Sequence, residues 1–172
     1  MKWPTVAELA TLMPAPEGYR FEPIAHADIT TVIASLKVWH PDISVGVSSC
    51  YLREDFYLKR VCLDDAADKD VWVVLLRFRG ELVGFWSVER EVDSLAIFAR
   101  LLVMAPAHRG ANLSAFVMTG GENIGRSMGA AFLYTLATLK IPHVQRALEH
   151  ADYRLLGFFP GYDREEVAPG VV

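Results

Sequence analysis

The sequence predicts one mixed α+β domain built around a single sheet. Two stretches with strand-like patterns, 71–78 and 81–89, are separated only by an Arg-Gly dipeptide, which is typical of a tight hairpin turn. A third strand pattern at 94–104 follows closely, and connections this short favour antiparallel pairing. A helical pattern then separates this third strand from the apolar run 131–137. Such a crossover allows these last two strands to be parallel, and we expect it to be right-handed.

Composition is that of an ordinary globular chain of 172 residues, which is long enough for one domain with a sizeable core. The formal net charge is −4 and no long basic run is present, so nucleic acid is not expected as a partner. No apolar run reaches the length of about 18 residues that predicts a transmembrane helix, and no membrane partner is expected.

The number and spacing of cysteines and histidines argue against a zinc site and against a secreted, disulfide-rich protein. No Cys/His cluster has the spacing of a zinc site, so no metal is expected. Two cysteines, Cys50 and Cys62, cannot form a disulfide framework of the secreted type. The first residues include three prolines and lack a sustained apolar core, which is unlike a signal peptide. We therefore expect a cytoplasmic protein.

Residues 1–17 are expected to form an N-terminal arm, followed by a single domain over 18–172. The apolar residues of the arm have the spacing of one or two helical turns: Val6, Leu9, Leu12 and Met13. Pro14 and Pro16 would end these turns. The arm could pack on the domain or on a second subunit. Together with the apolar run near the end of the chain, it favours a homodimer.

The domain is expected to begin with an alternating strand at 19–24. Asp28 is a good N-cap for the helix that follows. That helix has apolar residues at i, i+3, i+4 and i+7, namely Ile29, Val32, Ile33 and Leu36. We expect it to end near Trp39. A loop over 41–49 and a second helix over 51–62 then lead to a solvated acidic connection.

The stretch 101–129 organises the rest of the chain. An apolar strand ends at Pro106, and a helix opens at Asn112 or just before it. Gly110 lets the backbone approach a ligand closely because it has no Cβ. The unpaired first-turn amides and the helix dipole form an anion site suited to phosphate, and Arg109 adds a charge that can reach phosphate oxygens. The alternative is an ordinary strand-to-helix connection with a solvated Arg.

The helix after this loop has two interior glycines, Gly120 and Gly121. Each costs about 1 kcal/mol relative to Ala, so we expect tight packing or a bend there. Gly129 is a plausible C-cap. The strand that follows is expected to be mostly buried. A last helix with Pro142 in its first turn and a short strand at 155–159 complete the predicted order.

The motif loop carries a resemblance to a known family. The run VMAPAHRGANLS, residues 103–114, resembles the acyl-CoA-binding motif of the GNAT superfamily of N-acyltransferases, written Q/R-x-x-G-x-G/A. Arg109 and Gly110 match its most recognisable pair. Ala107 stands where Gln or Arg is usual, and Asn112 stands where the second Gly or Ala is usual.

A second match lies near the end of the chain. The run YRLLGFFP, residues 153–160, resembles the closing signature of the same family, Y-x-x-x-G-F. Tyr153 falls where many members place a tyrosine that protonates the leaving thiolate of CoA, and Gly157-Phe158 falls on the Gly-Phe pair. The order of predicted elements agrees as well, so the resemblance covers residues 18–162.

The resemblance implies a GNAT-like mixed sheet of about six to seven strands, mostly antiparallel with a parallel central pair, flanked by about four helices. It implies acetyl-CoA or another acyl-CoA as co-substrate, no metal, and direct attack by a small-molecule amine or a protein amino group. Tyr153 would be the catalytic acid. The pantetheine arm would pair with the backbone of Leu102, Val103 and Met104. The pyrophosphate would lie on amides of Arg109, Gly110, Ala111, Asn112, Leu113 and Ser114.

The general base is not identified by the sequence. Three carboxylates lie near the end of a central strand, where some family members keep one: Glu89, Glu91 and Asp93. His108 is expected to be exposed, and His143 and His150 are expected to face water. In the family, the region 39–49 shapes the acceptor site.

Two alternatives stay open. Because Ala107 and Asn112 depart from the motif, the protein could be a non-catalytic CoA-binding or sensory module of the same fold. It could also be an acyltransferase-like synthase that uses an acylated carrier protein, which would need a basic docking patch that is not evident in the sequence.

Overall fold

The computed structural model describes residues 1–64, 69–138, 142–160 and 162. In that part of the chain, five strands form one sheet in the spatial order β1-β2-β3-β4-β5. The strands are β1 (Tyr19–Pro23), β2 (Val71–Phe78), β3 (Glu81–Glu91), β4 (Ala96–Met104) and β5 (Phe132–Thr135). β4 and β5 are parallel, and all other neighbours are antiparallel. The predicted mixed sheet is confirmed, but it has fewer strands than expected and its parallel pair lies at an edge.

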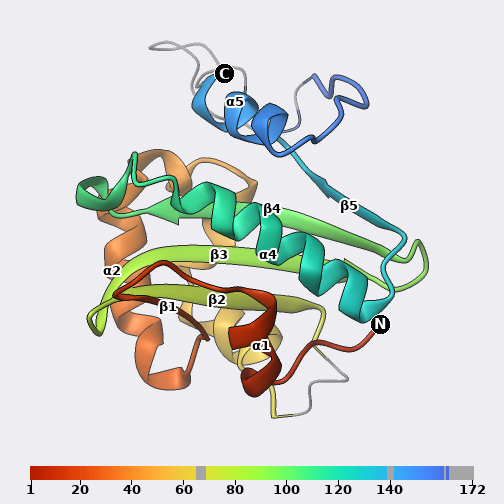
Figure 1. Ribbon diagram of the computed structural model, residues 1–172. Coiled ribbons are helices and arrows are strands. Elements are labelled where there is room, and N and C mark those ends of the chain that lie inside the picture. Colours follow the sequence, from red (N-terminus) through yellow and green to blue (C-terminus); the bar gives the residue numbers. More distant parts are fainter. Residues whose placement is uncertain (65–68, 139–141, 161, 163–172) are drawn as a thin grey trace.

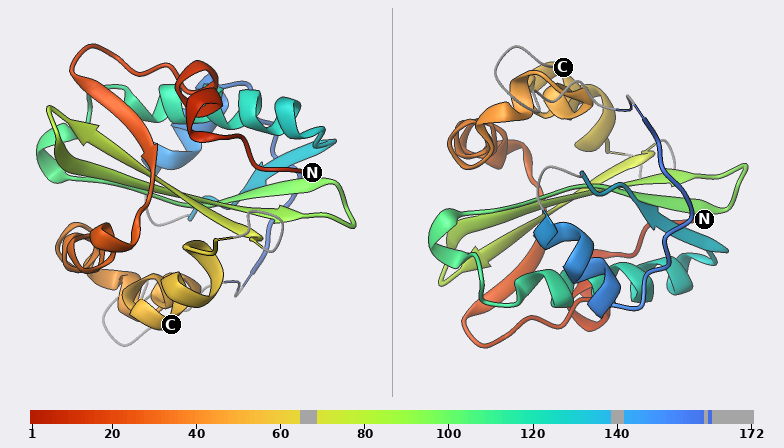
Figure 2. Two further views of the ribbon diagram at one scale, coloured as in Figure 1. Left: turned by 90° about the horizontal axis from the view of Figure 1, so that it is seen from below. Right: turned by 90° about the horizontal axis from the view of Figure 1, so that it is seen from above.

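Helices cover both faces of this sheet (Figures 1 and 2). One face carries α1 (Val6–Leu12), α4 (Leu113–Met128) and α5 (Pro142–His150). The other carries α2 (Ile29–Trp39) and α3 (Glu54–Phe56). Shorter helical turns are η1 (His26–Asp28), η2 (Pro41–Ser44), η3 (Val47–Leu52), η4 (Tyr57–Val61) and η5 (Pro106–His108). These are more helical segments than the expected four. Within the expected 51–62 helix, extended backbone at Arg53 separates η3 from α3, and α3 passes directly into the π-helical η4.

The β2–β3 hairpin forms as predicted. Arg79 and Gly80 both have positive φ, 51° and 93°, which matches the twist that a two-residue turn imposes on its strands. β3 continues to Glu91, two residues beyond the predicted end of that strand. The side chains of β2, β3 and β4 alternate between two apolar clusters, one under α1 and α4 and one under α2 and α3.

β4 contains a bulge that separates it into two halves. Ser87 of β3 opposes Leu101, whereas the next residue, Val88, opposes Ala99. Arg100 therefore has no opposing residue and forms a β-bulge. Pairing with β5 runs from Ala96–Phe132 to Ala99–Thr135 and ends at the same place. Beyond Arg100, β4 continues without β5 beside it.

The glycines inside α4 allow close packing, as predicted. A Cβ added at Gly120 would lie 2.6 Å from Met13 Cγ, and one at Gly121 would lie 3.3 Å from the Trp86 ring. Gly129 ends the helix with a φ of 72°, which confirms the predicted C-cap.

The N-terminal arm packs on its own domain. Helix α1 begins with a capping box in which Thr5 and Glu8 exchange hydrogen bonds. Leu9 and Met13 are buried in the core cluster under α1 and α4. The arm therefore no longer favours a second subunit. A homodimer stays a prediction supported by the apolar residues near the end of the chain, and light scattering would check it.

Three local expectations differ from the structure. Asp28 is the N-cap residue of α2, as predicted, but its side chain makes no capping bond, because its carboxylate accepts from Ala25 N–H (3.0 Å) and Arg77 Nη2 (2.5 Å) instead. β5 is not mostly buried: it is the edge strand, and Phe132 is 44% exposed. No strand forms at 155–159 within the described residues, and the apolar residues there are exposed, Leu155 by 93%.

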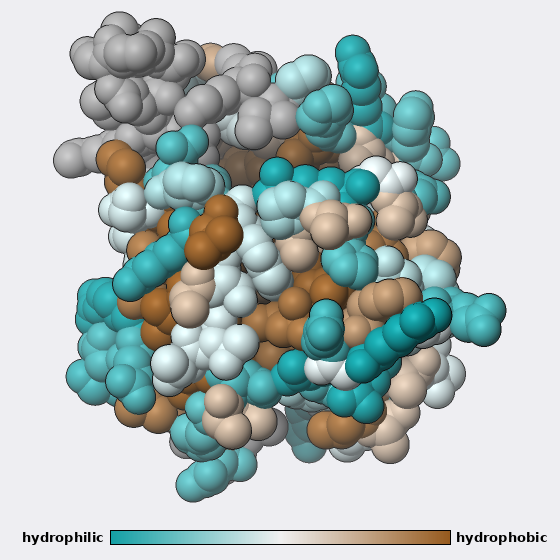
Figure 3. All heavy atoms as spheres, turned by 90° about the vertical axis from the view of Figure 1, so that its left-hand side faces the viewer, coloured by the Kyte–Doolittle hydropathy of each residue, from teal (hydrophilic) through white to brown (hydrophobic). Residues whose placement is uncertain are grey.

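The surface around the end of α2 is mixed in character. Viewed from the side on which α2, the β2–β3 turn and the start of α4 lie, apolar patches stand among polar side chains (Figure 3). Val38, Val45 and Val47 contribute exposed apolar surface in this part of the chain. In the described residues, no helix combines the length and apolarity needed to cross a bilayer, and no three His, Cys, Asp or Glu residues group together as a metal site would require.

Candidate active site

The unpaired half of β4 forms the first part of the candidate site. Val103 is buried under α2, whereas Leu102 and Met104 pack under α4. One backbone edge of this half pairs with β3, from Leu101–Ser87 to Met104–Gly84. Because β5 has ended at Thr135, the opposite edge can pair with an extended ligand. Of the three residues that sequence reasoning chose for pantetheine, Leu102 and Met104 turn their backbone groups to this edge, whereas those of Val103 face β3.

The loop after β4 leads directly into the start of α4. Arg109 N–H donates to Pro106 O at 3.3 Å, so this amide closes the η5 turn and is not available to an anion. Gly110 and Asn112 both have positive φ, 83° and 55°. The first bond of the helix runs from Ala115 N–H to Asn112 O at 3.1 Å. The amides between Gly110 and Ser114 precede that bond and have no intrahelical partner.

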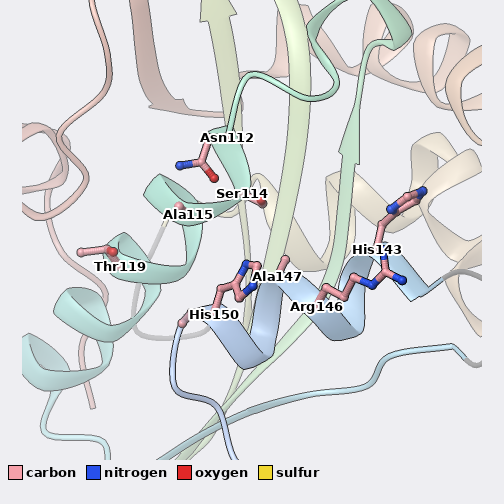
Figure 4. A pocket seen from close by; sticks show the side chains of 9 residues that line it. Asn112, Ser114, Ala115, Thr119, His143, Arg146, Ala147 and His150 are labelled. Carbon is pink, nitrogen blue, oxygen red and sulfur yellow. The ribbon is translucent and has the colours of Figure 1, made fainter.

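A pocket of about 310 Å³ opens between the first turns of α4 and the last helix (Figure 4). Its lining residues are Asn112, Ser114, Ala115, Thr119, His143, Arg146, Ala147, His150 and Ala151. Those from α5 and from Ala151, which directly follows it, fall at i, i+3, i+4, i+7 and i+8, and three of them are Arg or His. None of the described residues lining the pocket is a carboxylate, so the pocket suits an anion.

Three residues of this pocket bear on the sequence analysis. His143 and His150 are exposed, as expected, and both also line the pocket. Arg146, which lies between them on the same helical face, was missed altogether. The signal was present in the helical spacing, but only tertiary packing shows that this face is turned toward the start of α4.

Arg109 and His108 hold the loop in place. Arg109 Nε donates to Met104 O at 3.1 Å and its Nη2 donates to Trp39 O at 2.7 Å. His108 is half-buried, not exposed as expected, because its ring packs edge-on against Tyr19. Its Nδ1 lies 2.8 Å from the Tyr19 hydroxyl. The motif loop is thus attached to β1, to β4 and to the end of α2.

Tyr153 follows α5 directly. Its N–H donates to Leu148 O at 3.0 Å, after Asp152 has adopted a positive φ of 59°. The ring is half-buried, and burial, with a smaller contribution from the charge of Glu122, raises the pKa of Tyr153 to about 12. The phenol is therefore protonated at neutral pH, as a proton donor must be.

The three candidate carboxylates occupy different environments. Glu89 accepts from Arg100 Nη1 at 2.5 Å, beside the bulge where β5 ends. Glu91 accepts from the Tyr134 hydroxyl at 2.5 Å. Asp93 is exposed in the β3–β4 turn. Of the three, Glu89 lies nearest along the strand to the unpaired half of β4.

Comparison with known proteins shows what this fold is. No protein-family model matches the sequence, and no curated protein matches it. Mutant forms of the spermidine/spermine N-acetyltransferase SpeG from Vibrio cholerae match with a TM-score of 0.67 and 11% identity, over 86% of this chain and 89% of that one. AAC(6')-Iy, in complex with the bisubstrate analogue CoA-S-monomethyl-acetylneamine, matches with a TM-score of 0.64 and 10% identity over 84% and 96%.

An acetyltransferase from Trypanosoma brucei also matches, with a TM-score of 0.58 and 17% identity over 82% of this chain and 96% of that one. Identities this low show the fold alone. The chain has the fold of these acetyltransferases, as the resemblance to the GNAT superfamily implied.

Proposed function

We propose that the protein is an N-acyltransferase that moves an acyl group, in the first place acetyl, from acyl-CoA to an amine by direct attack. One observation carries this proposal: β4 parts from β5 at Arg100, and the unpaired half of β4 leads straight to a loop and helix start beside a basic pocket. A thioester with an extended arm and a phosphorylated end matches both parts. The CoA analogue bound to AAC(6')-Iy, which shares the fold, supports the same donor.

The donor would lie along this path. Its pantetheine arm pairs with the edge of β4 at Leu102–Met104 that β5 leaves uncovered, where Met104 O also accepts from Arg109 Nε. Its diphosphate accepts from the amides between Gly110 and Ser114. The positive end of the α4 dipole favours the negative charge there. Arg146, with His143 and His150, supplies side-chain donors to the phosphates from α5.

The chemical step transfers the acyl group from the thioester sulfur to the amine nitrogen. The amine nitrogen forms a bond to the thioester carbonyl carbon, and the C–S bond breaks. Glu89, directly or through water, accepts the proton that the amine loses, and Tyr153 gives a proton to the departing sulfur. Each such proton transfer typically contributes 10²–10⁴-fold to the rate.

The acceptor would be a small-molecule amine or a protein amino group. SpeG is a spermidine/spermine N-acetyltransferase, and this supports a small amine on this fold. A panel of such amines with acetyl-CoA, read by release of free thiol, tests the proposal. Turnover with at least one amine is the expected result, and acetyl-CoA binding without turnover across a broad panel would contradict it.

A non-catalytic CoA-binding module is the second candidate. It is favoured by Asn112, which takes a left-handed conformation and lines the pocket where the family motif has a Gly or Ala. The two candidates share the donor site and differ only in turnover, so the thiol-release assay separates them.

A further inference from the structure

The segment 39–52, which runs from the end of α2 to the end of η3, is fastened at two points to the unpaired half of β4. Arg100, at the start of that half, donates from Nη2 to Val47 O at 2.7 Å. Arg109, just past its end, donates from Nη2 to Trp39 O at 2.7 Å. Each arginine also holds part of the proposed site, because Arg100 Nη1 pairs with Glu89 and Arg109 Nε donates to Met104 O.

The surroundings of Arg100 show that its position is closely specified. Its guanidinium lies 5.9 Å from the centre of the Tyr51 ring, and Tyr51 in turn packs edge-on against Phe85 of β3. Tyr51 and its neighbour Ser87 have no exposed surface. Within the described part of the chain, Arg100 Nε, Tyr51 Oη and Ser87 Oγ are all buried without a hydrogen-bond partner. Such groups are commonly bridged by an internal water.

The geometry of the donor path determines where the amine arrives. The phosphate pocket lies between α4 and α5. Both helices lie on the same face of the sheet (Figure 2). A donor that runs from there along the β4 edge brings its thioester toward Arg100. The opposite face at that point is occupied by Glu89, Arg100 and the segment 39–52. In the proposal that follows, the amine approaches from the face that this segment covers.

We propose that Arg100 is a positioning residue for the acceptor amine, which rests on the proposed function. One guanidinium holds both the carboxylate of Glu89 and the backbone of the segment 39–52. The proposed base and the segment that forms the wall of the amine site are therefore positioned by the same side chain. Arg109 fixes the other end of the same wall to the cofactor loop. Donor and acceptor sites are thus joined through a single segment.

Arg100→Met removes both bonds but keeps an unbranched apolar stem over Tyr51. Because the segment 39–52 and Glu89 would lose their shared support, the KM for the amine should rise about tenfold or more. The acetyl-CoA affinity should stay unchanged. Backbone amides of the segment 39–52 should exchange hydrogen faster. Arg100→Lys should recover part of the KM, because an ammonium can still pair with Glu89.

Arg77→Lys is the matched control. Arg77 is as deeply placed as Arg100 and pairs with Glu22 and Asp28, but on the β1–β2 side of the sheet. It should leave both KM values and the exchange of the segment 39–52 unchanged. If Arg100→Met changes neither amine KM nor exchange, or if Arg77→Lys changes them equally, Arg100 has no positioning role.

The hydrogen-exchange and acetyl-CoA measurements do not need turnover. If the unmodified protein binds acetyl-CoA but transfers no acyl group, the catalytic proposal fails by itself. In that case, faster exchange at 39–52 in Arg100→Met with weaker equilibrium binding of an amine to the acetyl-CoA complex would still support the role of Arg100. Unchanged exchange and unchanged amine binding would overturn it.

Discussion

Replacing Gly120 by Ala tests how closely α4 packs against the N-terminal arm. The new Cβ would lie 2.6 Å from Met13 Cγ and 2.9 Å from Met13 Cε, whereas ordinary contacts begin at 3.4 Å. Met13 is only 1% exposed, so it has little room to move away. Overpacking of this kind costs about 1–3 kcal/mol. Ala in place of Gly in a helix returns about 1 kcal/mol, so we expect a net loss of about 0–2 kcal/mol.

Gly125 provides the matched control in the same helix. A Cβ there meets nothing closer than 3.8 Å, at the Ile97 side chain. Gly125→Ala should therefore keep the full helix-propensity gain and stabilise the protein by about 1 kcal/mol. The two substitutions are chemically identical, and they should differ by about 1–3 kcal/mol in the free energy of unfolding.

Urea denaturation followed by tryptophan fluorescence measures both variants, with the slope against urea expected to stay unchanged. A difference of about 2 kcal/mol corresponds to a shift of roughly 4–8 °C in Tm for a domain of this size. The double variant Gly120→Ala/Met13→Ala should be non-additive, because the contact that causes the loss is gone. Equal stabilisation by both glycine replacements would show that Met13 does not lie against Gly120.

Two predictions concern the proposed site. Acetyl-CoA at about 100 times its Kd should stabilise the protein by about 2.7 kcal/mol. Gly110→Ala should reduce that gain by placing a Cβ in the phosphate path. Gly80→Ala, at an equally open turn with a similar φ, should not reduce the stabilisation by acetyl-CoA. If both variants reduced it equally, the loop at Gly110 would not be part of the donor site. Tyr153→Phe should lower kcat by about 10²–10⁴ with little change in acetyl-CoA affinity. Because the pKa of Tyr153 is raised to about 12, kcat of the unmodified protein should not fall on the alkaline side of the usual assay range. Near-full kcat in Tyr153→Phe would show that Tyr153 is a packing residue.

Local patterns predicted the parts of the fold that depend on neighbours in sequence. The hairpin at Arg79-Gly80 needed only two residues able to adopt positive φ, and α4 followed from the spacing of its apolar face. The parallel β4–β5 pair followed from the helix between them. Each of these rests on interactions that span a few residues or one element.

The misses involve partners that are distant in sequence. Asp28 has a cap-forming side chain, but Arg77, on another strand, competes for it. The apolar run 155–159 has strand-like residues, but it has no partner strand among the described residues. Predicting the pocket required the position of α5 relative to α4, and the sequence of neither helix determines that position. The contacts that Arg109 makes to the backbone at Met104 and Trp39 were not anticipated either, although its role as a phosphate ligand stays a prediction.

The extra residue in β4 also constrains how this strand can change in length. Before the bulge, odd-numbered residues such as Ile97 and Ala99 pack under α4; after it, the even-numbered Leu102 and Met104 do so. Arg100 thus shifts the alternation of side chains between the two faces of the sheet by one residue. Deleting Arg100 would therefore leave Leu101 and Val103 in their present layer under α2, because the regular alternation of a strand would then run unbroken from Ala99 into them. The bulge is thus the place at which β4 can lose one residue and keep its other side chains in their layers, with the loss only of Arg100 and the bonds that it makes.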